Sequence, residues 1–206
     1  MNDLATNDSN SAEIQLLEAA SDIMRSGDTI DLSLSELSAK AGLNSALVKY
    51  YFGNKNGLML TLLERDMTRI VHDLDALIKK EMPAAEKVRL HIGKVIDTYY
   101  DYPYLNRLLM RMVRDNPAKE AANIAKEYLV PISKSYDKLI NDGIKEGVFL
   151  DIDPQMFYFT VTGAADRFFS ARLVLHHCYG QADITDKMRD DYREHTIELI
   201  MRGILK

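Results

Sequence analysis

Apolar residues recur at the spacing of an amphipathic helix along almost the whole chain, and this periodicity constrains the fold more than any other feature. The alternation of apolar and polar residues that indicates a half-buried strand persists nowhere. We therefore expect an all-α protein, with a small head of three N-terminal helices and a larger helical body. Interruptions by glycine, proline and small polar residues place the helices at about 13–25, 33–42, 45–52, 54–80, 84–100, 104–114, 118–146, 154–178 and 186–204. Pro131 has no backbone N–H to donate, so the helix at 118–146 is expected to kink or split there.

The composition is that of a globular protein with a sizeable core, since 47% of the residues are hydrophobic and 28% are charged. No apolar run approaches the roughly 20 residues that a bilayer-spanning helix needs. Residues 1–10 lack the basic and apolar regions of a secretory signal, and the single Cys178 cannot form an internal disulfide. We expect a cytoplasmic protein with no membrane segment.

Residues 41–58, AGLNSALVKYYFGNKNGL, form the most informative stretch of the sequence. They follow a Ser33-x-x-Glu36 capping box, and they read as a very short helix between two tight turns. A short helix buries little surface, which suits one that packs on its neighbours with one face and inserts the other into a major groove. The pattern thus predicts a helix-turn-helix. Leu47, Val48 and Phe52 are expected to face inward, and Ser45, Ala46 and Lys49 outward.

Residues 13–64 resemble the DNA-binding head of the tetracycline-repressor (TetR) family of bacterial transcription regulators. The resemblance rests on LSLSELSAKAGLNSALVKYYFGNKNGLMLTLLE, with its capped second helix, its aromatic run at 50–52 and its Asn54-Lys55 start of a long fourth helix. It covers about a quarter of the chain, and the body matches the family only in size and helical pattern. It implies a disordered tail at 1–12, a helix-turn-helix DNA-binding domain at 13–57 and a ligand-binding and dimerisation domain at 58–206.

The resemblance also implies which residues of the head meet DNA. Residues placed to touch phosphates, and sometimes bases, from the second helix are Ser33 and Ser35. Those placed to face the groove from the recognition helix are Asn44, Ser45, Ala46 and Lys49, and those placed to hold phosphates are Tyr50, Tyr51 and Lys55. Lys49 stands where the family most often has a tyrosine, and Leu47 where a threonine is common.

The body offers candidates for a ligand pocket, but any helical core of this size needs the same residue types. The candidate ligand residues are Tyr99, Tyr104, Arg111, Phe159 and Arg167. An arginine close to the core needs a partner, which is either an internal carboxylate or an acidic effector. The run His176-His177-Cys178 invites a metal site, but consecutive helical residues point about 100° apart and do not converge on one ion. We expect no metal and no cofactor.

Two classes of function fit these observations. The first is a homodimeric, ligand-responsive transcription regulator, most simply a repressor, whose partners are a pseudo-palindromic double-stranded DNA operator and a small-molecule effector. Its last two helices would form the dimer surface, as in the family. The alternative is an all-α dimeric ligand-binding or adaptor protein without sequence-specific DNA binding. The net charge of −5 favours the alternative, whereas the two lysines and absent acids of residues 41–58 favour the first. An enzyme is not expected, because the phosphate-binding loop, nucleophile elbow and His-Glu-x-x-His motifs are missing.

Overall fold

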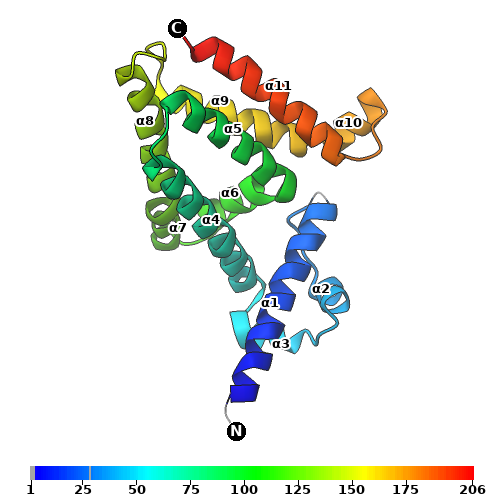
Figure 1. The fold of residues 1–206 in the computed structure, drawn as a ribbon. Coiled ribbons are helices and arrows are strands. Elements are labelled where there is room, and N and C mark those ends of the chain that lie inside the picture. The colour runs from blue at the N-terminus through cyan, green and yellow to red at the C-terminus, as the bar shows by residue number, and fades with distance from the viewer. Residues whose placement is uncertain (1–2, 28) are drawn as a thin grey trace.

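The computed structural model describes residues 3–27 and 29–206, with side chains from Ser11 onward, and these residues form an elongated all-α molecule (Figure 1). Helices α1 (Asp3–Ser26), α2 (Leu34–Ala41) and α3 (Ala46–Phe52) build the head. Helix α4 (Lys55–Lys79) leaves the head and runs into the body. The predicted tail falls partly on residues 1–2, outside the described residues, and the first predicted helix, 13–25, is the C-terminal part of α1.

Local signals in the sequence set the ends of the head helices. The Ser33 hydroxyl accepts a hydrogen bond from the Glu36 N–H at 3.0 Å and so caps α2. Gly42 ends that helix in the left-handed conformation, at φ 66°, which glycine adopts without strain. The Asn44 side chain then accepts from the Ala46 N–H at 2.8 Å and starts α3. The helices predicted at 33–42 and 45–52 therefore correspond to α2 and α3.

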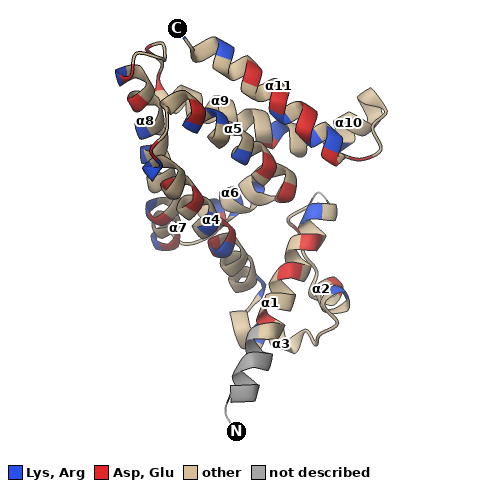
Figure 2. Ribbon diagram, in the orientation of Figure 1, with Lys and Arg blue, Asp and Glu red and all other residues tan. Residues whose placement is uncertain are grey.

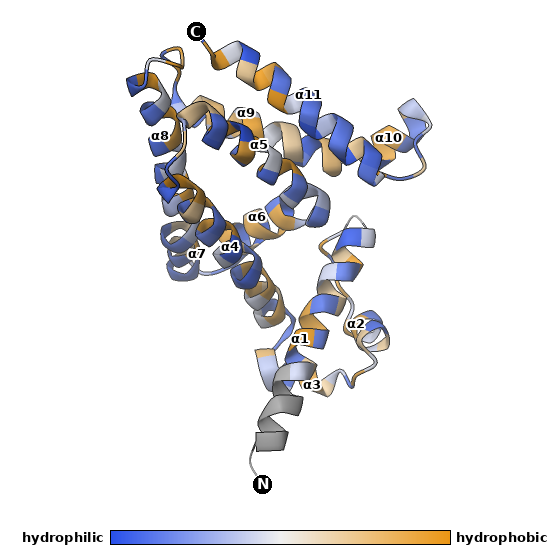
Figure 3. Ribbon diagram, in the orientation of Figure 1, coloured by the Kyte–Doolittle hydropathy of each residue, from blue (hydrophilic) through white to orange (hydrophobic). Residues whose placement is uncertain are grey.

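The body consists of the helices that follow α4, which pack on one another and on α4. They are α5 (Ala84–Asp101), α6 (Leu105–Asp115), α7 (Ala118–Ile124), the π-helical turn η1 (Ala125–Leu129), α8 (Val130–Lys145), α9 (Pro154–Phe169), α10 (Arg172–Tyr179) and α11 (Asp186–Ile204). Apolar residues line the inner faces of these helices (Figure 3). One core joins the head to α4, α6 and α7, and a second lies among α4, α5, α8, α9 and α11.

Two predicted helices are divided in the structure. The helix predicted at 118–146 becomes α7, η1 and α8, as expected from Pro131, which leaves the helical ladder one donor short. The π-turn absorbs the mismatch, with the Val130 N–H donating to the Ala125 carbonyl. The helix predicted at 154–178 was expected to be continuous, but it breaks at Ser170 and Ala171 into α9 and α10.

The apolar face predicted for the last helix is largely covered by the chain itself. Ile200 and Ile204 are buried, and Met188 and Tyr192 are half-buried, because α11 packs along α5 and against the end of α9. Leu199, at 64% exposure, points away from the body. The sequence pattern of α11 therefore reflects packing within one protomer more than an interface.

Candidate DNA interface and effector cavity

The head presents a mainly polar set of exposed residues from α2, α3 and the residues that precede these helices. Its exposed residues are Ser33, Ser35, Asn44, Ser45, Ala46 and Lys49. Leu47 and Phe52 are half-buried and Val48 is buried, so α3 faces as its sequence predicted. Lys49 is the single charged residue of α3.

Tyr50 and Tyr51 diverge, as neighbouring helical residues must. Tyr50 is 75% exposed, whereas Tyr51 is half-buried against the core of the head. Their rings meet edge to face, with centroids 4.8 Å apart. The exposed tyrosine is thus held by its neighbour at the edge of the polar surface.

Lys55 begins α4 and ties it to the loop before α2. Its Nζ donates to the Leu32 carbonyl oxygen at 2.9 Å, an interaction that the sequence did not indicate. The ammonium group has three N–H donors, so this bond leaves donors for a phosphate. The position is also at the N-terminus of a helix, where unpaired N–H groups favour an anion.

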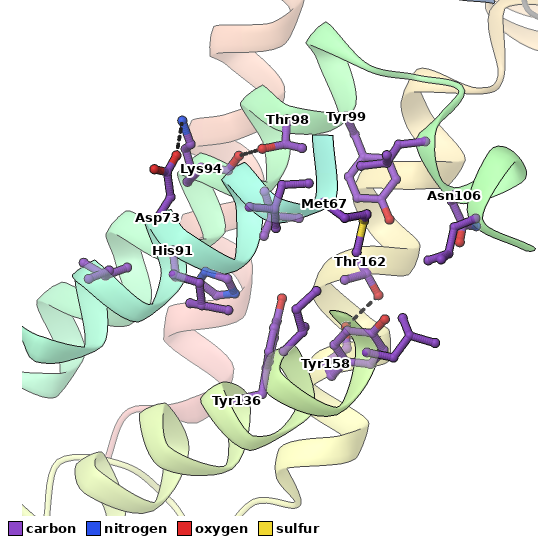
Figure 4. Close-up of a pocket in the computed structure, with 18 residues that line it drawn as sticks. Met67, Asp73, His91, Lys94, Thr98, Tyr99, Asn106, Tyr136, Tyr158 and Thr162 are labelled. Carbon is purple, nitrogen blue, oxygen red and sulfur yellow. Dashed lines mark hydrogen bonds and ion pairs between the residues drawn. The ribbon is translucent and has the colours of Figure 1, made fainter. Parts of the chain in front are cut away.

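A cavity of about 100 Å³ lies in the body between α4, α5, α6, α8 and α9 (Figure 4). Most of its wall is apolar, contributed by Met67, Ile70, Leu74, Leu77, Val95, Leu105, Leu109, Leu129 and Ile132. Its polar lining consists of His91, Thr98, Tyr99, Asn106, Tyr136, Tyr158 and Thr162. Asp73 and Lys94 pair with each other at 3.4 Å, and their exposed side chains place the pair at the rim.

Burial controls the ionisation of the polar lining. It raises the pKa of the Tyr99, Tyr136 and Tyr158 hydroxyls, which therefore stay protonated at neutral pH. It lowers the pKa of His91 to about 4, so that ring is uncharged at neutral pH. The cavity is an apolar chamber with neutral hydrogen-bonding groups.

Of the predicted ligand residues, the structure brings Tyr99 to the cavity wall. Tyr104 is fully buried outside that lining, Phe159 is 60% exposed on α9, and Arg167 is exposed on the same helix. Arg111 pairs with Asp31 at 3.0 Å and with Asp115 at 3.7 Å, so its partners are internal carboxylates. The sequence left open whether a buried arginine pairs with an internal carboxylate or with an acidic effector. For Arg111 the partner is an internal carboxylate.

Sequence reasoning missed the polar residues that define the cavity, above all His91, Tyr136 and Tyr158. A signal existed for His91, which falls on the apolar face of its helix together with Val88 and Val95. The sequence held no such signal for Tyr136 and Tyr158. A tyrosine that packs in the core and one that lines a cavity occupy the same apolar positions of a helix.

A buried polar network joins the head to the body beside the cavity. Tyr104, before α6, donates to Asp66 Oδ2 on α4 at 2.9 Å. Ser21 of α1 lies 2.8 Å from the same hydroxyl, and it must be the donor because the tyrosine proton goes to Asp66. Arg65 donates to Asp66 at 2.9 Å and to Glu18 of α1 at 2.8 Å. Two elements of the body thereby hold α1 of the head.

Further contacts strengthen this junction. Arg111 of α6 reaches Asp31, in the loop between α1 and α2. Arg25, at the end of α1, lies 3.9 Å from Asp101 and 5.7 Å from the centroid of the Tyr100 ring, both at the end of α5. The head is therefore tied to α5 and α6 as well as to α4.

The burial of His91 predicts a loss of stability in acid. Its pKa is lowered from 6.5 to about 4 by folding, so the unfolded chain binds the extra proton throughout that window. The stabilisation is complete above pH 6.5 and is lost as the pH falls toward 4, by about 3 kcal/mol of unfolding free energy at 1.36 kcal/mol per pKa unit. In His91→Phe this part of the pH dependence should disappear.

Chemical denaturation of both proteins across this window checks the prediction. His72→Phe is the matched control, because it makes the same replacement at a histidine whose side chain is 80% exposed. Parallel profiles for wild type and His91→Phe would contradict the prediction.

The histidines and the cysteine of α10 do not form a metal site. His176, His177 and Cys178 are exposed on α10. Across residues 3–27 and 29–206, no group of three His, Cys, Asp or Glu side chains is arranged to hold a metal ion. Within the same ranges, no helix has the length and apolarity required to span a membrane.

The chain is similar in sequence to known transcriptional regulators. HTH-type transcriptional regulator BetI 1 of Chromohalobacter salexigens is 30% identical over 98 residues, which are 47% of this chain and 46% of that protein. The chain thus spans about half the length of this curated relative. The fatty acid metabolism regulator protein of Bacillus subtilis is 23% identical over 152 residues, covering 72% of this chain and 78% of that one.

Solved structures share the fold over nearly the whole chain. The crystal structure of FadR from Bacillus subtilis in complex with stearoyl-CoA matches with a TM-score of 0.61 at 17% identity, covering 89% of this chain and 97% of that one. The model of the tetracyclin repressor-like C-terminal domain matches residues 81–206, more than half of the chain. With the helix-turn-helix head that the sequence predicted, the chain belongs to the tetracycline-repressor (TetR) family of transcriptional regulators.

Proposed function

We propose that this protein is a ligand-responsive repressor that binds a pseudo-palindromic operator as a homodimer. One observation carries the proposal: α4 both holds the head and lines the cavity. Arg65 of this helix contacts Glu18 of α1, and Asp66 is linked to Ser21 of α1 through the Tyr104 hydroxyl. The next residue, Met67, faces the cavity (Figure 4). Leu105 and Asn106 of α6 also line the cavity. They directly follow Tyr104, which donates a hydrogen bond to Asp66.

A ligand that fits one arrangement of α4 and α6 better than another shifts the population of head positions. In a dimer, this changes the distance between the two recognition helices, and binding to half-sites one helical turn or a multiple apart depends on that distance. The coupling free energy equals the difference in ligand affinity between the two arrangements. The proposal is consistent with the stearoyl-CoA complex of the similar FadR and with a cytoplasmic location, where operator DNA is present.

In this proposal, the polar surface of the head meets DNA in two ways. The residues facing base edges are Asn44, Ser45, Ala46 and Lys49, and those contacting phosphates are Ser33, Ser35, Tyr50, Tyr51 and Lys55. Phosphate contacts position the protein, and base contacts carry the sequence information. Because the surface has few cations, few counterions are released on binding, so we expect a modest affinity with a shallow dependence on salt.

Replacing Lys49 with Ala tests whether this protein reads DNA sequence. Lysine on the exposed face of the recognition helix can donate to the O6 and N7 acceptors of a guanine. We expect the variant to lose roughly 1–3 kcal/mol of binding free energy on the operator and to relax the preference at one base pair of each half-site. Selection from randomised duplexes with both proteins measures the preference.

Lys40→Ala is the control, since Lys40 lies on α2 and pairs with Asp22 at 3.5 Å. If Lys49→Ala weakens all duplexes equally and keeps the preference, Lys49 contacts a phosphate instead. Absence of duplex binding by wild type even at low salt would favour the alternative, a dimeric ligand-binding or adaptor protein, which the acidic balance of the sequence supports.

We assign the dimer surface to α9 and α11, at the end of the body far from α3 (Figure 1). Met156 and Phe159 of α9 are 64% and 60% exposed, and Leu199 of α11 is 64% exposed. Such residues are costly to leave in water when they share one surface. Elsewhere on α8 and α11, basic and acidic side chains are interspersed (Figure 2), which keeps those surfaces soluble.

Sedimentation velocity at micromolar concentration should show a dimer for wild type and a monomer for Phe159→Glu. The introduced carboxylate would have to be buried without a partner in the interface. Ile14→Glu is the matched control, because Ile14 is a 50% exposed apolar residue on α1 of the head. A monomeric wild type, or a dimeric Phe159→Glu, would contradict this assignment.

A further inference from the structure

His91 carries a polar atom that the folded chain leaves without a partner. The side chain is buried, with 6% exposure, and it points from α5 into the cavity (Figure 4). Its Nε2 makes no hydrogen bond to any residue that the structure describes. Buried polar atoms are nearly always paired, and an exception on a cavity wall indicates a missing ligand or water.

The surroundings of His91 show what kind of group can meet that atom. Its ring packs edge to face on Tyr136, with centroids 4.6 Å apart, and Tyr136 packs in the same way on Tyr158 at 5.0 Å. Burial keeps the His91 ring neutral, and a neutral imidazole donates from one nitrogen and accepts at the other. A ligand hydroxyl can pair with Nε2 in either tautomer, whereas a carbonyl oxygen pairs with it when Nε2 carries the proton.

The charges of the cavity disfavour an ionic ligand. Asp73 and Lys94 neutralise each other at the rim, at 3.4 Å. The remaining lining is apolar or uncharged, so a buried carboxylate would have no opposite charge, and an ammonium group would find one only in Asp166, whose Oδ1 has no hydrogen-bond partner among the described residues. Asp166 lies behind the lining, where it accepts a hydrogen bond from Asn106 at 2.9 Å. The competing occupant is a quaternary ammonium group, which tyrosine rings can hold through cation–π contacts.

We propose, on the basis of the effector role proposed above, that the cavity binds an uncharged molecule with an apolar body and a single hydroxyl or carbonyl oxygen that hydrogen-bonds to His91 Nε2. The apolar wall from α4, α6 and α8 takes the body of the molecule. The neutral ring and the tyrosine hydroxyls select the oxygen. Net charge on the ligand is then the property that the cavity discriminates against.

Three probes with the same chain and different head groups test the proposal: n-octanol, octanoate and octyltrimethylammonium. Calorimetric titration of the full-length protein should give an affinity for n-octanol at least tenfold higher than for either ion. His91→Phe should weaken n-octanol binding by tenfold or more, whereas the exposed His72→Phe control should bind as wild type does. The ranking on wild type does not depend on the variant folding.

Tightest binding of octanoate or of octyltrimethylammonium would overturn the proposal, and so would failure of all three probes to bind. Octanol affinity unchanged in folded His91→Phe would overturn the role of His91. Duplex binding measured on the same samples separates this inference from the proposed function. A protein that binds operator DNA but prefers an ion contradicts the ligand class alone, and one that binds n-octanol but no DNA contradicts the regulator alone.

Discussion

Gly57→Ala is expected to abolish operator binding and to lower the free energy of unfolding by about 2–3 kcal/mol. A Cβ atom at this position would lie 2.0 Å from the carbonyl oxygen of Phe52 and 3.1 Å from its carbonyl carbon. Both atoms belong to the backbone at the end of α3, so no side-chain rotation relieves the clash. The recognition helix must therefore move relative to α4.

A hydrogen bond also prevents Gly57 from moving away from Phe52. Its N–H donates to the Asn54 side chain at 3.0 Å, which caps α4. Operator affinity by titration and stability by denaturation measure the two effects. Gly203→Ala is the control, because a Cβ there meets no atom within 4 Å. Wild-type affinity in Gly57→Ala would show that the turn tolerates the shift and that the recognition helix is not fixed by it.

Asp66→Ala is expected to cost about 3–5 kcal/mol of unfolding free energy, the range for breaking a buried charged pair. Asp66 is 2% exposed and accepts from both Tyr104 and Arg65. Its removal leaves the inner side of the Arg65 guanidinium without an acceptor, and the Tyr104 hydroxyl then has only Ser21 as a partner. It also breaks the path from α6 to α1, so the response of DNA binding to ligand should weaken.

Asp66→Asn is the matched variant, and it should be much milder because the amide oxygen still accepts from Tyr104. Burial raises the pKa of Asp66 despite the neighbouring Arg65. A raised pKa means that this group favours folding most at low pH and loses that contribution as the pH rises through its folded pKa. The stability of Asp66→Asn relative to wild type should therefore grow with pH. Equal losses for the Ala and Asn variants would show that shape, and not hydrogen bonding, governs this site.

Most helix boundaries were predictable because their signals are local. The hydroxyl of Ser33, the amide of Asn44 and the left-handed Gly42 act within a few residues of their own position. The helix-turn-helix and its outward-facing Lys49 followed from the same signals together with helical periodicity. The exposure of Tyr50 beside the half-buried Tyr51 has the same local origin, since adjacent helical residues cannot share one core.

Helical periodicity predicts which face of a helix is apolar but not which other helix covers that face. Only the tertiary structure decided this. The apolar stripe of α11 is covered by α5, and α9 and α10 are separate helices where the sequence pattern is continuous. Lys55 meets a carbonyl oxygen from a loop more than twenty residues away, a contact that no local pattern encodes.

The sequence by itself determined the all-α class and the helix-turn-helix of the head, because caps, turns and periodicity depend on residues close in the chain. Only the tertiary structure brought His91, Tyr136 and Tyr158 from three helices to one cavity. It alone also placed Ser21, Asp66 and Tyr104 in one network. The physical reason is that burial and hydrogen bonding between distant segments are set by how helices cross, and crossing depends on the side chains of both partners at once.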